Sequence, residues 1–139
     1  GDVLTVGSRT YVGLTLRTNQ AGVAQLAAAL GGDVVGVPTN RVLHLKSAVT
    51  ALPDGRVIGF EPLVDDPTAF EGFTPVPEEP GSHVVLLDDR HLLMAASAPR
   101  SAELFASWGY EPVVVDISEF EKLEGCVTCL SVRLRTPPH

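Results

Sequence analysis

Two cysteines, Cys126 and Cys129, are separated by two residues and are the side chains best suited to covalent chemistry. A Cys-x-x-Cys pair can serve in redox exchange or bind zinc, but neither role fits well. A thioredoxin-type pair places its attacking thiol at a helix N-terminus, whereas Leu130, Val132 and Leu134 alternate with polar residues as in a strand. A structural zinc site needs four ligands, and the sequence has no second cysteine pair. We therefore predict no metal and no essential disulfide, which leaves Cys129 as a structural thiol or a nucleophile.

A histidine and an arginine could work with such a nucleophile. His44 lies in the apolar segment 42–46, where it either bonds to a backbone carbonyl in the core or pairs with a thiolate as its acid and base. Arg17 lies where a predicted strand meets a predicted helix, either as a solvated charge or as a bidentate clamp for a carboxylate. His83, His91 and His139 have weaker claims, because two flank predicted strand edges and the last ends the chain.

The elements that must position these residues form a repeat. Residues 3–6 and 11–16 are predicted strands, followed by a helix over 21–30 and a strand over 33–37. The helix begins after Thr18 or Asn19 as cap and stops at Gly31-Gly32. The order is strand, strand, helix, strand.

The same order recurs later in the chain. It uses residues 84–87, 92–95 and 113–115 as strands, with a helix that opens at Pro99. The region between the two copies, with a tight turn at residues 53–55 and a proline-rich stretch up to Gly81, is interpreted as a third copy with a degraded helix. Such modules bury their sheets only by packing on one another, and two and a half copies do not close a ring.

The segment before Cys129 should hold a short helix. Ser118 and Glu121 have the spacing of a capping box, and the helix should end near Gly125. Cys129 would then lie where a loop enters a closing strand, a common place for a catalytic residue.

Composition narrows the function classes. The 139 residues are 45% hydrophobic and 19% charged, which predicts one globular domain, 1–139. No apolar stretch is long enough for a membrane span and no signal peptide is recognisable, so we expect a cytoplasmic protein without a membrane partner. The net charge of -7 disfavours nucleic acid. It would suit a cationic ligand, although an acidic surface is usually only a solvated one.

Four groups of residues resemble one enzyme family, the dimethylarginine dimethylaminohydrolases, and they occur in that family's order along the whole chain. They are Gly1-Asp2-Val3-Leu4, Val12-Gly13-Leu14 with Arg17-Thr18-Asn19-Gln20, Leu43-His44-Leu45-Lys46-Ser47, and Glu121-Lys122-Leu123-Glu124-Gly125 with Thr128-Cys129-Leu130-Ser131.

The resemblance implies an α/β fold, a pentein propeller of five ββαβ modules, of which this chain would be about half, the C-terminal half of a catalytic domain. It implies that Cys129 is the nucleophile, that His44 is its acid and base, and that Arg17 holds the substrate's α-carboxylate. Leu123 and Glu124 would contact the substrate at the mouth of the site. The acid that orients the histidine should lie just before Gly1, and Asp2 is not assigned that role.

The predicted function is hydrolysis of dimethylarginine to citrulline and dimethylamine through a covalent cysteine thiouronium intermediate, without a cofactor. The predicted partners are a methylated arginine and an N-terminal half of the same enzyme or a second copy. Arginine deiminase is the nearest alternative, which Lys46 after the histidine disfavours. A non-catalytic half-propeller that needs a partner chain is the other.

Overall fold

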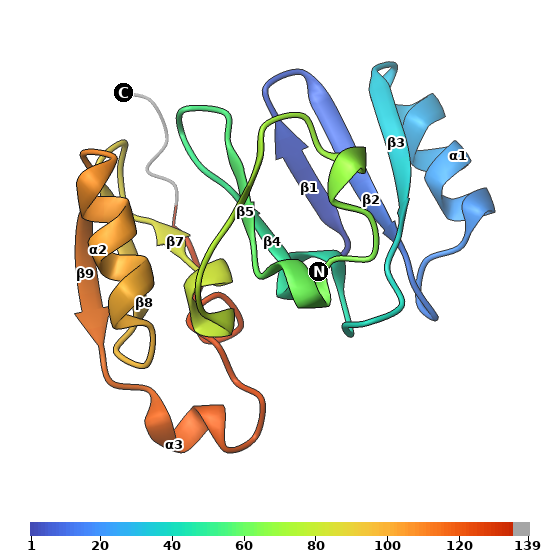
Figure 1. The fold of residues 1–139 in the computed structure, drawn as a ribbon. Helices are drawn as coiled ribbons and strands as arrows, with labels where there is room; N and C mark the ends of the chain where they lie inside the picture. The colour runs from blue at the N-terminus through green and yellow to red at the C-terminus, as the bar shows by residue number, and fades with distance from the viewer. Residues whose placement is uncertain (135–139) are drawn as a thin grey trace.

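The computed structural model describes residues 1–134, so Arg135 and His139 lie outside the described part. Three separate three-stranded sheets follow one another along the chain, in the orders β1-β2-β3, β4-β5-β6 and β7-β8-β9 (Figure 1). In each sheet the first two strands are antiparallel and the third pairs parallel with the second. The predicted three copies of one module are confirmed.

The first module has β1 (Val3–Val6), β2 (Arg9–Leu14), α1 (Gln20–Leu30) and β3 (Asp33–Pro38). The side chain of Asn19 accepts a hydrogen bond from the Gly22 amide and caps α1, one of the two predicted caps. Gly31 ends the helix at a φ of 64°, a left-handed conformation that glycine adopts without strain.

The middle module has β4 (Val49–Ala51), β5 (Val57–Gly59) and β6 (Phe73–Pro75). Two short 3₁₀ turns, η2 (Glu61–Leu63) and η3 (Pro67–Ala69), stand in place of the crossover helix. Pro67 at the start of η3 has no amide to donate to the Leu63 carbonyl, so a helix that began at η2 could not continue through it. The degraded helix of this copy is thereby explained.

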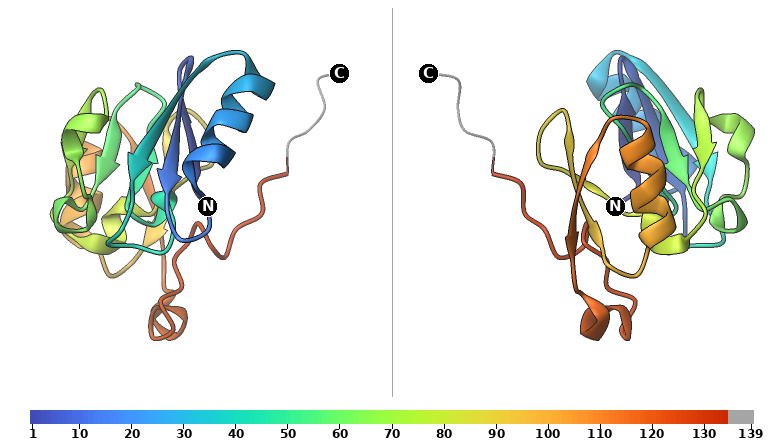
Figure 2. Two further views of the ribbon diagram at one scale, coloured as in Figure 1. Left: turned by 90° about the vertical axis from the view of Figure 1, so that its right-hand side faces the viewer. Right: turned by 60° about the vertical axis from the view of Figure 1, so that its left-hand side comes forward.

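The third module has β7 (Val85–Leu86), β8 (His91–Ala95), α2 (Pro99–Ser107) and β9 (Glu111–Val115). It follows the 3₁₀ turn η4 (Glu79–Ser82), and Pro99 occupies the first turn of α2 as predicted. Figure 2 shows α1 and α2 at opposite ends of the row of sheets.

The middle sheet is buried between two hydrophobic clusters. Val57 and Ile58 are adjacent on β5 and both fully buried, and they point to opposite faces because side chains alternate along a strand. Val57 packs with Tyr11 and Phe70 in one cluster. Ile58 packs with Leu92 and Phe105 in the other. The middle sheet therefore joins its two neighbours into one body.

The segment after β9 departs from the prediction in two ways. α3 (Ser118–Glu121) is present, but its N-cap is Ile117 and the predicted capping box is wrong. The Ser118 amide instead donates to Asp116 Oδ1 at 2.9 Å. The closing strand is also wrong, because residues 127–130 form a turn and residues 131–134 have no regular structure.

The last two apolar residues of the alternation after Cys129 gain little burial from the described part of the chain. Val132 is 87% exposed and Leu134 is 92% exposed, and an apolar alternation forms a strand only where a neighbour pairs with its backbone and covers one face. The three sheets do not close into a ring within residues 1–134. In the same part of the chain, no helix has the length and apolarity to cross a membrane.

Candidate active site

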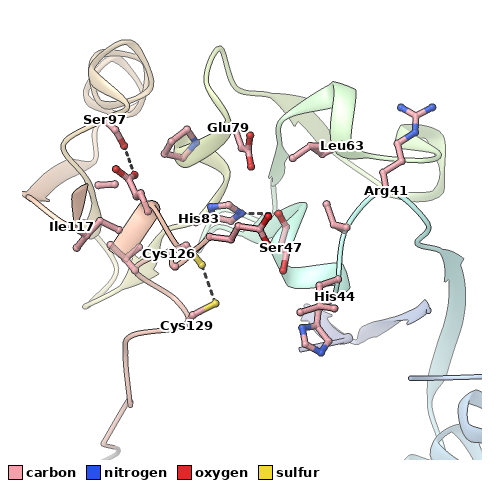
Figure 3. A pocket seen from close by; sticks show the side chains of 18 residues that line it. Arg41, His44, Ser47, Leu63, Glu79, His83, Ser97, Ile117, Cys126 and Cys129 are labelled. Carbon is pink, nitrogen blue, oxygen red and sulfur yellow. Dashed lines mark hydrogen bonds between the residues drawn. The ribbon is translucent and has the colours of Figure 1, made fainter. Parts of the chain in front are cut away.

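A cavity of about 600 Å³ opens between the segment before η1 (Leu45–Ser47), the turn η4 and the loop after α3. Figure 3 shows His44, His83, Cys126 and Cys129 around it. A second cavity of about 570 Å³ borders β1, β4 and β7 and shares His44, Ser47 and Cys129 with the first. His44 and Cys129, predicted to work together, thus line the same space although they lie 85 positions apart in the sequence (129 − 44).

His44 precedes η1 and is partly exposed, with extended backbone at φ −140° and ψ 154°. Its carbonyl accepts a hydrogen bond from the Ser47 amide at 2.9 Å, which fixes the local turn. The alternative considered for His44 was a core histidine bonded to a backbone carbonyl. The structure has such a histidine at His83 instead. The His83 ring is buried and its Nε2 lies 2.7 Å from the Ser47 carbonyl oxygen. His83 lines the cavity and had no assigned role in the sequence analysis.

The two cysteines share one backbone turn. The Leu130 amide donates to the Cys126 carbonyl at 3.1 Å, and this turn places both sulfurs on one side, with Sγ atoms 3.1 Å apart. Cys126 is buried and Cys129 is exposed. The hydrogen bond with the Cys126 sulfur is the main cause that raises the pKa of Cys129, and burial adds to it.

The two residues before this turn have unusual backbone requirements. Glu124 has a φ of 60°, the left-handed region that non-glycine residues seldom adopt. A Cβ on Gly125 would lie 2.9 Å from the Phe120 carbonyl oxygen, so only glycine fits there. Glu124 lines the cavity, as expected of a residue at its mouth, whereas Leu123 is 87% exposed and is not part of the lining.

Arg17 is not brought to this cavity by the described residues. It lies at the exposed tip of a turn closed by backbone hydrogen bonds between Thr15 and Thr18. The Arg17 amide donates to Thr15 Oγ1 at 3.1 Å, so its backbone is fixed while its side chain is free to reach outward.

Asp2, left without a role in the sequence analysis, connects the two predicted binding segments. Its buried carboxylate accepts hydrogen bonds from the hydroxyls of Thr18 at 2.7 Å and Thr15 at 3.0 Å, and from the Leu45 amide at 3.0 Å. Burial raises the pKa of Asp2, but the hydrogen bonds from Thr18, Leu45 and Thr15 and the proximity of His44 outweigh it and lower the pKa overall.

Gly1 positions the same histidine by close contact. A Cβ on Gly1 would lie 2.5 Å from Cγ of His44, and the Gly1 carbonyl accepts a hydrogen bond from the Lys46 amide at 3.0 Å. Gly1 and Asp2 thus fix the backbone of the two residues that follow His44. The sequence signal was an aspartate beside a glycine at the start of an apolar strand, where a charge needs several partners to be buried.

Charges around the first cavity favour a cation. Glu79, Glu121 and Glu124 contribute carboxylates to the lining, and Arg41 contributes the one arginine. Arg41 is already held by the Pro62 carbonyl, 3.0 Å from its Nη1. Glu121 accepts a hydrogen bond from the Ser97 hydroxyl, which ties α3 to the loop before α2. Among residues 1–134, no group of three or more His, Cys, Asp or Glu side chains is placed to hold a metal ion.

Comparison with curated proteins finds close relatives. No family model matches the chain. It is 68% identical over 138 residues to an N(G),N(G)-dimethylarginine dimethylaminohydrolase of Streptomyces coelicolor, covering 97% of this chain and 54% of the relative. A protein of the same name from Pseudomonas aeruginosa is 34% identical over 142 residues, with 96% and 54% covered. The chain spans about half the length of the curated relatives it matches.

Solved structures agree with these relatives. The Pseudomonas aeruginosa enzyme, as a mutant complexed with citrulline, superposes with a TM-score of 0.80 at 31% identity, covering 96% of this chain and 54% of that one. A dimethylarginine dimethylaminohydrolase adduct with S-methyl-L-thiocitrulline gives 0.81 at 30% identity, with 96% and 55% covered. An amidinotransferase from Microseira wollei, at 16% identity and 0.80, covering 99% of this chain and 47% of that one, shares the fold alone.

Proposed function

Because the chain belongs to the dimethylarginine dimethylaminohydrolase family, we propose that it contributes the nucleophile and the histidine to hydrolysis of methylated arginine. The observation that carries the proposal is that Cys129 and His44 line one cavity whose other charged side chains are mostly carboxylates. A guanidinium is a cation, so this acidic lining attracts the substrate. The Cys129 thiol belongs to the same lining and can act on the bound guanidinium as the nucleophile.

The reaction begins when the Cys129 thiolate adds to the central guanidinium carbon and forms a C–S bond. His44 then gives a proton to the dimethylamine nitrogen, and the C–N bond breaks to leave a thiouronium. His44 next takes a proton from water, and the hydroxide adds to the same carbon. The tetrahedral carbon then expels the Cys129 thiolate while its hydroxyl group loses a proton to solvent. This releases citrulline and leaves Cys129 as thiolate and His44 protonated for the next turnover.

The raised pKa of Cys129 bears on the first step. A thiol with a raised pKa carries little thiolate near neutral pH, and an arriving cation stabilises the thiolate. Deprotonation as the cationic substrate binds is therefore the route that fits this site better than a permanently ionised thiol.

Binding of the α-carboxylate end of the substrate requires further residues. Arg17 binds the α-carboxylate, and its turn keeps a fixed relation to His44 through Asp2. Leu123 and Glu124 contact the substrate at the mouth. The N-terminal half of the enzyme, or a second copy of this chain, supplies the remaining carboxylates and closes the sheets into a propeller. The exposed Leu123, Val132 and Leu134 provide apolar surface for that contact.

The test uses the enzyme completed with an N-terminal half. Dimethylarginine should give citrulline and dimethylamine in equal amounts, and unmethylated arginine should be a poor substrate. Cys129→Ser should abolish turnover, and His44→Gln should lower kcat by about 10²- to 10⁴-fold. His91→Gln is the matched control, because His91 begins β8, lines neither of the two cavities and pairs with Asp88. Preference for arginine would favour a deiminase, and equal effects of both histidine changes would refute the role of His44.

A further inference from the structure

The proposed hydrolysis needs one thiol, but the cavity holds two. The Sγ atoms of Cys126 and Cys129 are 3.1 Å apart, and both residues line the first cavity. The redox interpretation of the Cys-x-x-Cys pair was set aside because a strand was expected after Cys129, and that strand is absent. The residues instead form one turn, in which positions three apart face the same side.

We propose that Cys126 is a resolving thiol that captures oxidised Cys129 as a reversible disulfide, which makes this turn a site of peroxide modification. The Cys129 thiolate attacks one oxygen of a hydroperoxide, the O–O bond breaks, and Cys129 becomes a sulfenic acid while water or an alcohol leaves. The Cys126 thiolate then attacks the Cys129 sulfur, an S–S bond forms, and the hydroxyl group leaves as water. The two thiols are oxidised and the peroxide is reduced.

Accessibility sets the order of the two steps. Cys129 is exposed and meets a dissolved oxidant first, whereas Cys126 is 8% exposed and is shielded by the turn. The Cys126 sulfur is already in contact with the sulfur it would attack. A sulfenic acid with a neighbouring thiol condenses to a disulfide, whereas one without a neighbour is open to further, irreversible oxidation.

The surrounding structure allows the bond to form locally. The turn lies in the segment after α3, outside all three sheets, so a bond between its first and fourth residues leaves the strand pairing untouched. The only other side chain bonded to the Cys126 sulfur is Thr128, whose hydroxyl lies 3.0 Å away in the described structure. Dithiols would reverse the bond by thiol–disulfide exchange.

The consequence for activity, unlike the disulfide itself, rests on the proposed function. A Cys129 sulfur bonded to Cys126 has no lone thiolate to add to a guanidinium carbon, so the oxidised enzyme should be inactive. Reduction should restore it. The pair would thus replace irreversible oxidation of Cys129 with a reversible loss of activity.

The test follows the mass of one peptide. Trypsin leaves both cysteines in residues 123–133, since cleavage falls after Lys122 and Arg133. The whole protein is treated with hydrogen peroxide, its free thiols are blocked with N-ethylmaleimide, and the peptide is analysed. The expected wild-type peptide is lighter by two hydrogens, carries no maleimide, and regains two maleimides when dithiothreitol precedes the blocking. In Cys126→Ser, Cys129 should instead gain two or three oxygens that dithiothreitol does not remove.

The activity of the completed enzyme is followed in parallel, as a fraction of each variant's own untreated rate. Dithiothreitol should recover most of the loss in the wild type and little of it in Cys126→Ser. If Cys126→Ser fails to fold, Cys126→Ala replaces it. The modification of the wild-type peptide tests the proposal in either case. Two maleimides on the peroxide-treated wild type, or equal irreversible oxidation of Cys129 in both proteins, would overturn the proposal. An enzyme inactive before any treatment would contradict the proposed function alone.

Discussion

Accessibility separates the two thiols of the turn that holds Cys126 and Cys129. Cys129 is exposed and lines the same cavity as His44, whereas Cys126 is buried. We expect an amidine alkylator that mimics a guanidinium to label Cys129 first, because the acidic lining attracts the cation and the Cys129 sulfur is reachable. Fragmentation of the labelled peptide locates the adduct. Faster labelling of Cys126 would contradict the assignment of the nucleophile.

The pKa of Cys129 should depend on the neighbouring Cys126 thiol. Only the thiolate reacts with an alkylator, so a raised pKa moves the curve of alkylation rate against pH to higher pH. With neutral iodoacetamide, we expect the midpoint for Cys129 to lie above the ordinary value of a thiol and to fall in Cys126→Ser, because the hydrogen bond that is the main cause of the shift is removed. An unchanged midpoint in the variant would show that the cause lies elsewhere.

His44 and Cys129 could be proposed as site residues from sequence because each lies in a motif that resembles one family. Asp2 could not be assigned, since its role depends on three hydrogen bonds to residues 13, 16 and 43 positions away (15 − 2, 18 − 2 and 45 − 2). Such a convergence is a property of the fold. The local pattern, an aspartate at the start of an apolar strand, indicates only that the charge needs partners and not which residues they are. The same holds for His83, whose partner is a backbone carbonyl on another turn.

At the scale of elements, Asp2 ties the start of β1 to the Thr15–Thr18 turn and to η1. We expect Asp2→Asn to lower the free energy of unfolding by about 1–3 kcal/mol, because an amide nitrogen cannot accept the bonds that the carboxylate accepts. Asp33→Asn is the matched control, since Asp33 forms an exposed ion pair with Arg9 and should change stability by about 1 kcal/mol or less. Urea unfolding of the full chain measures both.

The same carboxylate predicts a pH dependence. The pKa of Asp2 is lower in the folded chain than its ordinary value of 3.8, so its contribution is complete above that value and is lost as the pH falls through the folded-state pKa. The difference between wild type and Asp2→Asn should therefore shrink in acid. A constant difference, or equal losses in Asp2→Asn and Asp33→Asn, would count against this role.

The turn that carries Arg17 can be tested with a change that keeps the charge. In the completed enzyme, Arg17→Lys should raise KM about 10- to 100-fold with a smaller effect on kcat, because lysine cannot form a bidentate pair with the α-carboxylate. The KM of an analogue without the α-carboxylate should change little with the same substitution. Arg9→Lys, at the other end of β2, is the control. If both ligands lose affinity equally, Arg17 has a structural role.

Elements with local signals were predictable and those without were not. Asn19 and Gly31 mark the ends of α1, and Pro99 marks the start of α2. The strand expected after Cys129 also had a clear alternation, but a strand requires a partner, and a single segment cannot reveal whether one is present. The Ser118 capping box failed because Asp116 binds the same backbone amide that would begin the motif.

At the scale of the whole molecule, we predict that the 139-residue chain alone is inactive or nearly so. On the proposed function the chain holds the nucleophile and the histidine, and none of its residues is assigned as the acid that orients that histidine. Loss of the corresponding acid in a serine triad lowers kcat about 10⁴-fold. Citrulline formation should appear when a separately produced N-terminal half is added. Robust turnover by the monomeric chain would refute this.

The same isolated chain should associate with itself. Leu123, Val132 and Leu134 are each at least 87% exposed, and apolar side chains gathered on one segment favour contact with another surface. Sedimentation at increasing concentration should show a rising mass that the N-terminal half suppresses. A mass that stays monomeric at every concentration would mean that these residues need no partner.

The middle sheet keeps its strand order although two 3₁₀ turns have replaced its crossover helix. A shared strand order with different connections is the pattern that duplication of one unit, followed by divergence of its crossovers, would leave. A search for the ancestral repeat should therefore align β1-β2-β3, β4-β5-β6 and β7-β8-β9 by strand register and leave the connections out. Reconstruction guided by the helices would discard the middle copy, the one that both hydrophobic clusters share.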